Sequence, residues 1–188
     1  MVTVGCDVVT QVWHHWHRVW IYVVLLIPVA VLAAVALRAL RPSGSWRRSV
    51  AEVGMVLGTL PWLWMIMTPM ELPPHATTVY LVPFSDLWDS LTTENAVPIG
   101  VQVGGNLLVL LALGFFAPIR FAAMASLTRL GVLGLAFSLT VELVQHAFVS
   151  GRVFSVDDVL LNAAGCVVGG LLSRPWWSGA PTAPSPAS

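Results

Sequence analysis

The feature that most constrains this chain is a series of apolar stretches, each close to 20 residues long and almost free of charge. A bilayer core is about 30 Å thick, and a helix needs about 20 apolar residues to cross it. Only 10% of the 188 residues are charged and 57% are hydrophobic, which leaves too little polar surface to cover a water-soluble globule. The sequence therefore predicts an integral, multi-pass protein of the cell membrane.

Five stretches qualify as spans, so the predicted fold is an all-α, polytopic transmembrane helical bundle. The predicted spans are Val19 to Leu37, Val53 to Met70, Val101 to Ile119, Leu130 to Val149, and Val156 to Ser173. The fifth has the shortest uncharged core. Residues 1–18 are expected to form an extracytoplasmic interfacial segment, residues 19–173 the transmembrane domain, and residues 174–188 a disordered cytoplasmic tail.

The arginines predict how the bundle is oriented. All nine basic residues are Arg, and positive charges in short loops favour the cytoplasmic side. With the N-terminus outside and the C-terminus inside, seven of them fall on the cytoplasmic side: Arg38, Arg41, Arg47, Arg48, Arg120, Arg129 and Arg174. The sequence therefore predicts five spans in an N-out, C-in topology.

Few polar side chains interrupt the last three predicted spans, and they fall at similar depth near the outer ends. An ionisable side chain inside a membrane is costly and by default suggests function. Glu142 and Gln145 are three residues apart and Asp158 and Asn162 four apart, so each pair can share one helix face. The candidate ligand-binding residues are Asn106, Glu142, Gln145, Arg152, Asp157, Asp158 and Asn162.

Packing alone is an open alternative for these side chains. Interhelical hydrogen bonds in membranes contribute about 0.6 kcal/mol each on average, and Glu142 could be protonated or paired with Arg152. The glycine pairs Gly54/Gly58 and Gly165/Gly169 have the spacing that lets helices approach closely. We expect both glycine pairs to serve packing.

No sequence motif identifies a reaction, a cofactor or a metal. A P-loop, a GxSxG motif and an HExxH motif are all missing from the sequence. Cys6 and Cys166 are expected to be unpaired, and His14 and His17 are expected to lie in the interfacial segment rather than to bind metal. A net charge of zero without a basic face excludes nucleic acid as a partner.

Three stretches resemble the motifs of VanZ-like membrane proteins. They are Asn106 to Pro118, Ser138 to Gln145 with its Glu-x-x-Gln pair, and Arg152 to Gly165 with its Asp-Asp pair; Val82-Pro83-Phe84 resembles the Pro-Phe element of the preceding loop. The resemblance spans about residues 55 to 173. Tyr80 stands where the family often has Asn, and Leu110 and Ala112 replace a common Phe and Pro.

The resemblance implies a protein of the bacterial cell envelope, since the family is named after a protein associated with low-level teicoplanin resistance. With the polar cluster, it favours a non-enzymatic protein that binds membrane lipids and the head group of a lipid-linked wall precursor or lipoglycopeptide, and so contributes to glycopeptide resistance. A membrane enzyme that modifies a lipid head group, with Glu142 or Asp158 as general base and Arg152 on phosphate, stays open. A small transporter or scramblase is a further open alternative for the function. Assembly into a homo-oligomer is also open.

Overall fold

Helices make up nearly all of the part of the chain that the structure describes. The computed structural model describes residues 3–41, 44–69, 79–92 and 97–178, with only the backbone at 3–16, 18–20, 97, 98 and 101. The helices are α1 (Thr3–Leu40), α2 (Trp46–Ile66), α3 (Ser85–Thr92), α4 (Val97–Arg120), α5 (Leu127–Phe148), α6 (Val156–Leu172) and α7 (Arg174–Trp177), with a 3-10 turn η1 (Ala122–Met124). This confirms the predicted helical fold.

One pair of very short strands was not predicted. Strand β1 (Val79–Tyr80) lies parallel to β2 (Phe154–Ser155), with Val79 opposite Phe154. The pair joins the segment before α3 to the segment before α6. Each strand has only two residues, which is too few for an alternating pattern to be recognised in the sequence.

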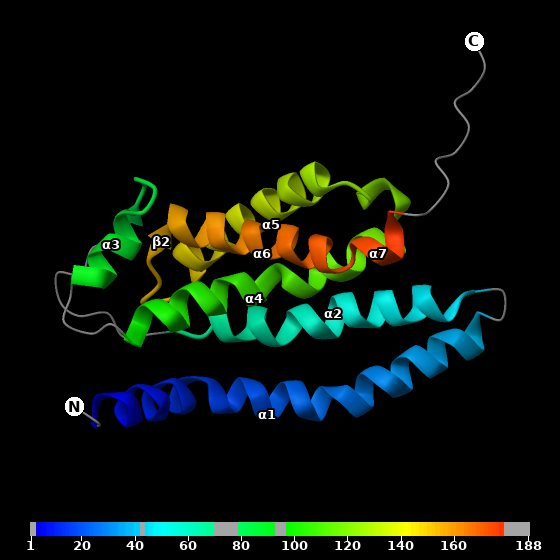
Figure 1. Ribbon diagram of the computed structural model, residues 1–188, viewed down its shortest axis with the longest axis horizontal. Helices are drawn as coiled ribbons and strands as arrows, with labels where there is room; N and C mark the ends of the chain where they lie inside the picture. Colours follow the sequence, from blue (N-terminus) through cyan, green and yellow to red (C-terminus); the bar gives the residue numbers. More distant parts are fainter. Residues whose placement is uncertain (1–2, 42–43, 70–78, 93–96, 179–188) are drawn as a thin grey trace, which may run out of the picture.

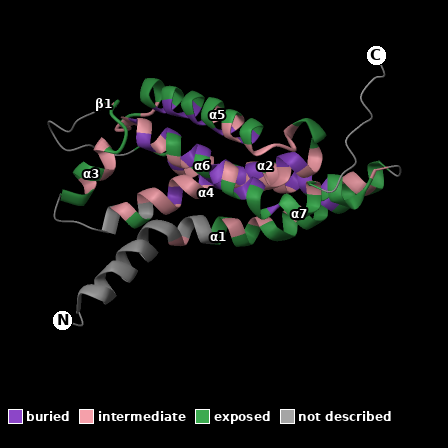
Figure 2. Ribbon diagram, turned by 45° about the horizontal axis from the view of Figure 1, so that its top comes forward, coloured by how far each residue is buried: buried purple, intermediate pink, exposed green. Residues whose placement is uncertain are grey.

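The long helices lie alongside one another and alternate in direction (Figure 1). Helices α1, α4 and α6 run from the end of the bundle that carries α3 toward the end that carries α7, and α2 and α5 run back. We call these the α3 end and the α7 end. Helix α4 packs against α6 and α2, α5 packs against α6, and α1 packs against α2. Buried residues gather on α2, α4 and α6, whereas α1 is largely exposed (Figure 2).

Four of the described helices are long and apolar enough to cross a membrane. They are Ile21–Leu40 within α1, Trp46–Ile66, Gln102–Arg120 within α4, and Leu127–Phe148. They correspond to the first four predicted spans and indicate a multi-pass membrane protein. Helix α6 has 17 residues and two acids in its first turn, so the fifth crossing stays a prediction.

Helical structure continues beyond both ends of the predicted transmembrane domain. Helix α1 is continuous from Thr3 to Leu40, so the backbone of the N-terminal segment prolongs the first span. At the other end, Arg174–Trp177 is helical where a disordered tail was predicted. Pro175 suits a first helical turn, and Trp177 Nε1 donates to the carbonyl oxygen of Gly170 at 3.2 Å. Residues 179–188, and the side chains of His14 and Cys6, lie outside the described residues.

Glycines allow α4 and α6 to approach until their backbones touch. A Cβ added to Gly114 would lie 1.8 Å from the carbonyl oxygen of Cys166. A Cβ on Gly165 would lie 2.0 Å from the carbonyl oxygen of Leu107, and Gly169 meets α4 in the same way. The packing role predicted for Gly165 and Gly169 is confirmed.

The second predicted glycine pair lies between α2 and α4. A Cβ on Gly54 would come within 2.5 Å of the Phe116 ring, and one on Gly58 within 2.7 Å of the Ala112 Cβ. Glycine therefore permits close packing on two sides of α4, which makes this helix the centre of the bundle.

Replacing Gly114 by Ala is expected to destabilise the fold by at least about 3 kcal/mol, because the new methyl group meets backbone that cannot move aside. Gly104→Ala on the same helix is the matched control, since nothing lies within 4 Å of its added Cβ. Denaturant titration of the purified protein in detergent measures both free energies of unfolding. Equal stability of the two variants would contradict the close-packing interpretation.

Candidate functional site

The centre of the candidate site is a hydrogen-bonded group of side chains from α3, α4 and α6. Asn106 donates through Nδ2 to Oδ1 of Asp158. Gln102, one turn earlier on α4, donates through Nε2 to Asp86 Oδ2 at 2.7 Å and to Asp158 Oδ1 at 3.4 Å. Two carboxylates therefore share one amide nitrogen. We call Asp86, Gln102, Asn106 and Asp158 the amide–carboxylate cluster.

Sequence reasoning found only half of this cluster. Asn106 and Asp158 were among the candidates, and the structure brings them together. Gln102 was detectable, because it precedes Asn106 by four residues and so shares its helix face. Asp86 carried no such signal, because only the placement of α3 against α4 and α6 brings it to the cluster.

Asp157 caps helix α3 instead of joining the cluster. Its Oδ1 accepts a hydrogen bond from the backbone N–H of Phe84 at 2.5 Å, and its Oδ2 accepts from the N–H groups of Asp86 and Leu87 at 3.1 Å each. The first N–H groups of a helix have no partner within the helix, and a carboxylate satisfies them. Asp157 is only 2% exposed, and its carboxylate joins α6 to α3 through three hydrogen bonds.

Arg152 and Gln145 bind the C-terminal carbonyl groups of α2. Arg152 donates through Nε to the Thr68 oxygen and through Nη2 to the Met65 oxygen, both at 3.1 Å. Gln145 donates through Nε2 to the Ile66 oxygen at 2.7 Å. The last carbonyl groups of a helix need such external donors, so these two candidates hold the end of α2 in place.

Glu142 is buried, and its carboxylate forms no ion pair with an arginine of the described residues. It is 3% exposed, and its Oε2 accepts from the backbone N–H of Ser155 at 3.4 Å. The ion pairs among the described residues join Glu52 to Arg41 and to Arg120, so the pairing of Glu142 with Arg152 that was considered is not made.

Arg152 interacts electrostatically with the nearby carboxylates of Glu142 and Asp158, although it forms no ion pair with them. Burial lowers the pKa of the Arg152 guanidinium from its usual value, while the charges of Glu142 and Asp158 act in the opposite direction. Because an arginine pKa starts so high, the side chain stays charged at neutral pH. The Arg152 guanidinium binds carbonyl groups at the end of α2. The four members of the amide–carboxylate cluster include no cation.

Asn162 joins α5 to α6. Its Nδ2 donates to Ser138 Oγ at 2.9 Å, and both residues are 1% exposed. This bond is the interhelical link that the packing alternative predicted. The remaining oxygens of two candidates, Asn162 Oδ1 and Gln145 Oε1, are buried and have no hydrogen-bond partner.

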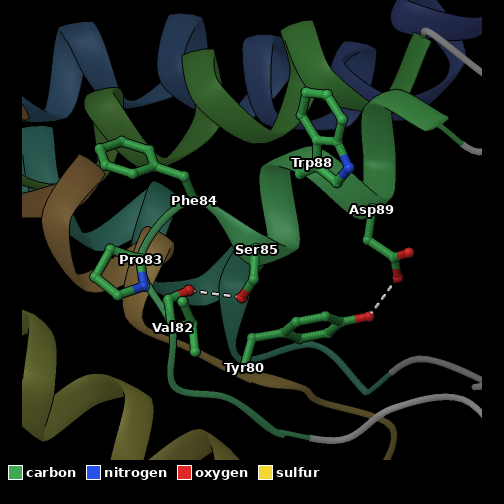
Figure 3. Close-up of a pocket in the computed structure, with 7 residues that line it drawn as sticks. All are labelled: Tyr80, Val82, Pro83, Phe84, Ser85, Trp88 and Asp89. Carbon is green, nitrogen blue, oxygen red and sulfur yellow. Dashed lines mark hydrogen bonds between the residues drawn. The ribbon is translucent and has the colours of Figure 1, made fainter.

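A shallow hollow of about 540 Å³ opens on α3 and the segment before it (Figure 3). Its lining residues are Tyr80, Val82, Pro83, Phe84, Ser85, Trp88 and Asp89. The Tyr80 hydroxyl donates to Asp89 Oδ2 at 2.7 Å. Asp86 lies on the same short helix, but the lining of the hollow includes no member of the amide–carboxylate cluster. Within the described residues, no group of three His, Cys, Asp or Glu side chains is placed to hold a metal ion.

These features define a helical, multi-pass membrane protein whose polar side chains gather at one end of the bundle. A family model described as VanZ/LLP1 matches residues 55–177, from α2 through α7, which includes every residue of the candidate site. The chain belongs to the VanZ/LLP1 family, as the motifs predicted. No curated protein sequence and no solved structure matches the chain.

Arg152→Ala is expected to lower the free energy of unfolding by about 1–3 kcal/mol, because it removes the guanidinium donors of the Thr68 and Met65 carbonyl oxygens; the Met65 oxygen keeps only its bond from the Thr68 N–H. Arg48→Ala is the matched control. Its side chain is exposed at the α7 end, so its effect should stay within about 0.5 kcal/mol. Thermal unfolding in one detergent compares them, and a full-stability Arg152→Ala variant would contradict the clamping role.

Proposed function

We propose that this protein binds the polar head of an amphiphile at the amide–carboxylate cluster, reached from the outer leaflet of the cell membrane. The proposal depends on one observation: Asp86 and Asp158 are held against a single amide donor, Gln102 Nε2. Placing two carboxylates together is unfavourable for stability, and costly ionisable groups in a membrane protein are a default sign of function. Unlike Asp157, Arg152 and Gln145, these two side chains cap no helix end among the hydrogen bonds described.

The cluster suits a head group that donates hydrogen bonds. When ionised, its carboxylates can accept hydrogen bonds but not donate them. Arg152, the nearby cation, already donates to carbonyl groups at the end of α2. Hydroxyl, amide and ammonium groups would complement it. Lipid-linked cell-wall precursors and lipoglycopeptides carry such donors on an amphiphilic framework, and we propose them as ligands. Contribution to teicoplanin-type glycopeptide resistance is the cellular consequence that we propose.

Binding without turnover is the form of this function that the contacts favour. The enzymatic alternative needs a cation to stabilise phosphate charge beside a general base. It assigned that task to Arg152, whose guanidinium instead donates to the carbonyls of Met65 and Thr68.

We further propose that the α3 end faces outward, with the N-terminus outside, the C-terminus inside and α6 as the fifth crossing. The support is the charge distribution. Helix ends and loops at the α7 end carry seven of the nine arginines and a single acid, Glu52, which pairs with Arg41 at 2.9 Å and Arg120 at 2.5 Å. Such an excess of positive charge favours the cytoplasmic side.

Cysteine labelling on intact cells tests the topology. In a Cys6→Ser background, Thr92→Cys and Ser150→Cys at the α3 end should react with a membrane-impermeant maleimide. Ala123→Cys, equally exposed but at the α7 end, should react only after permeabilisation. The native Cys166 is fully buried and supplies the blank. Labelling of Ala123→Cys on intact cells would overturn the orientation.

Asp158→Asn is expected to weaken binding of a lipoglycopeptide or lipid-linked precursor at least tenfold, which is about 1.4 kcal/mol. The amide removes a charge but keeps an oxygen that can accept from Asn106. Fluorescence titration of the purified protein in nanodiscs measures the dissociation constant. Asn162→Ala is the control for a structural polar residue, since it should lower stability and leave the affinity of the folded protein unchanged. Equal affinities for wild type and Asp158→Asn would rule out this site.

A further inference from the structure

A group of large apolar side chains projects from the α3 end without packing on the bundle. We call it the apolar foot; its members are Leu81 at 67% exposure, Val82 at 67%, Phe84 at 69%, Trp88 at 68% and Leu91 at 60%. All lie within the described stretch 79–92, which contains no Lys or Arg. Contiguous exposed apolar side chains of this size mark an interaction surface.

Helix α3 divides the foot from the polar cluster. Trp88 and Leu91 are three residues apart and share one helix face, while Asp86 points to Gln102 on another. The rings of Phe84 and Trp88 project from one side of the segment, away from the Tyr80 ring (Figure 3). A short amphipathic helix with a Trp on its apolar face is typical of elements that lie in a membrane interface.

The tip of the foot is held in an unusual backbone conformation. Phe84 has φ 67°, the left-handed region that non-glycine residues rarely adopt. Its N–H donates to Asp157 of α6 at 2.5 Å, and the same carboxylate holds Asp86 and Leu87. The conformation is thus maintained while the Phe84 ring stays outside the bundle, and strain kept in place by surrounding contacts points to a functional segment.

We propose that the apolar foot inserts into the outer leaflet at the level of the head groups, and that Asp157 holds it there. The occupant is lipid, because the foot lies in the connection between two membrane-spanning helices, α2 and α4, and therefore meets the bilayer surface. Tryptophan favours this boundary, having an apolar body and a polar N–H.

One consequence deepens the proposed function and rests on it. With the foot in lipid, the amide–carboxylate cluster lies on the neighbouring face of α3 at head-group depth. An amphiphile could then present its head to Asp158 while its tail remains in the leaflet.

Site-specific fluorescence quenching tests the insertion. In a Cys6→Ser background, Val82→Cys, Phe84→Cys and Trp88→Cys are labelled with bimane and reconstituted in vesicles of phosphatidylcholine and phosphatidylglycerol. Nitroxide-labelled lipid quenches from the bilayer and iodide quenches from water. The ratio of lipid to iodide quenching should be at least about threefold higher at these positions than at Asp89→Cys on the polar face. Ratios equal to that of Asp89→Cys would overturn the insertion.

Asp157→Asn tests the clamp. It should lower the ratio at the Phe84 position and leave unchanged the ratio at Leu32→Cys, a residue of α1 that is 69% exposed. An unchanged Phe84 ratio would overturn the role of Asp157. If this variant does not fold, the single-cysteine comparison in the otherwise native chain still decides the insertion. If quenching places the foot in water while the protein still binds its ligand, only the insertion is contradicted. If the foot is inserted but the protein does not bind the ligand, only the proposed function is contradicted.

Discussion

The backbone contact between α4 and α6 is the constraint on which the rest of the structure depends. In a bilayer the lipid tails are as apolar as the side chains, so helices associate through close packing and polar contacts rather than through burial of apolar surface. Gly114 and Gly165 permit this approach because any side chain there would meet a carbonyl oxygen of the other helix. The same two helices carry Asn106 and Asp158, and their closeness brings that amide to that carboxylate.

Three of the seven candidate residues in the family motifs bind backbone groups at the ends of helices. An unsatisfied backbone group in a bilayer costs several kcal/mol, and three motif residues remove such costs. Asp157 caps α3, and Arg152 and Gln145 supply donors to the end of α2. The seven candidates therefore divide by role, and two of them, Asn106 and Asp158, meet Asp86 and Gln102 in the amide–carboxylate cluster.

The parts of this molecule that sequence predicted well depend on local composition. An uncharged run of about 20 residues is typical of a membrane span. The first, third and fourth spans were predicted within three residues at each end, whereas the second was predicted to start seven residues after α2 begins. The boundaries at the ends were less accurate. Helix α7 depends on contacts with Gly170 and on Arg47, whose Nη2 reaches the Trp176 oxygen, and contacts between distant residues leave no periodic signal in the chain.

The sequence by itself determined the helical class, the family and the end of the bundle where polar side chains gather, because apolar length, motif spacing and helical periodicity are local properties. Only the tertiary structure decided which of those side chains hold the ends of other helices and which meet in the amide–carboxylate cluster. The partners of Asp157, Arg152 and Gln145 are backbone atoms of other elements, and the position of a backbone atom is set by how helices pack. For the same reason Asp86, which lies 16 residues from Gln102 along the chain, became part of the candidate site only in the folded protein.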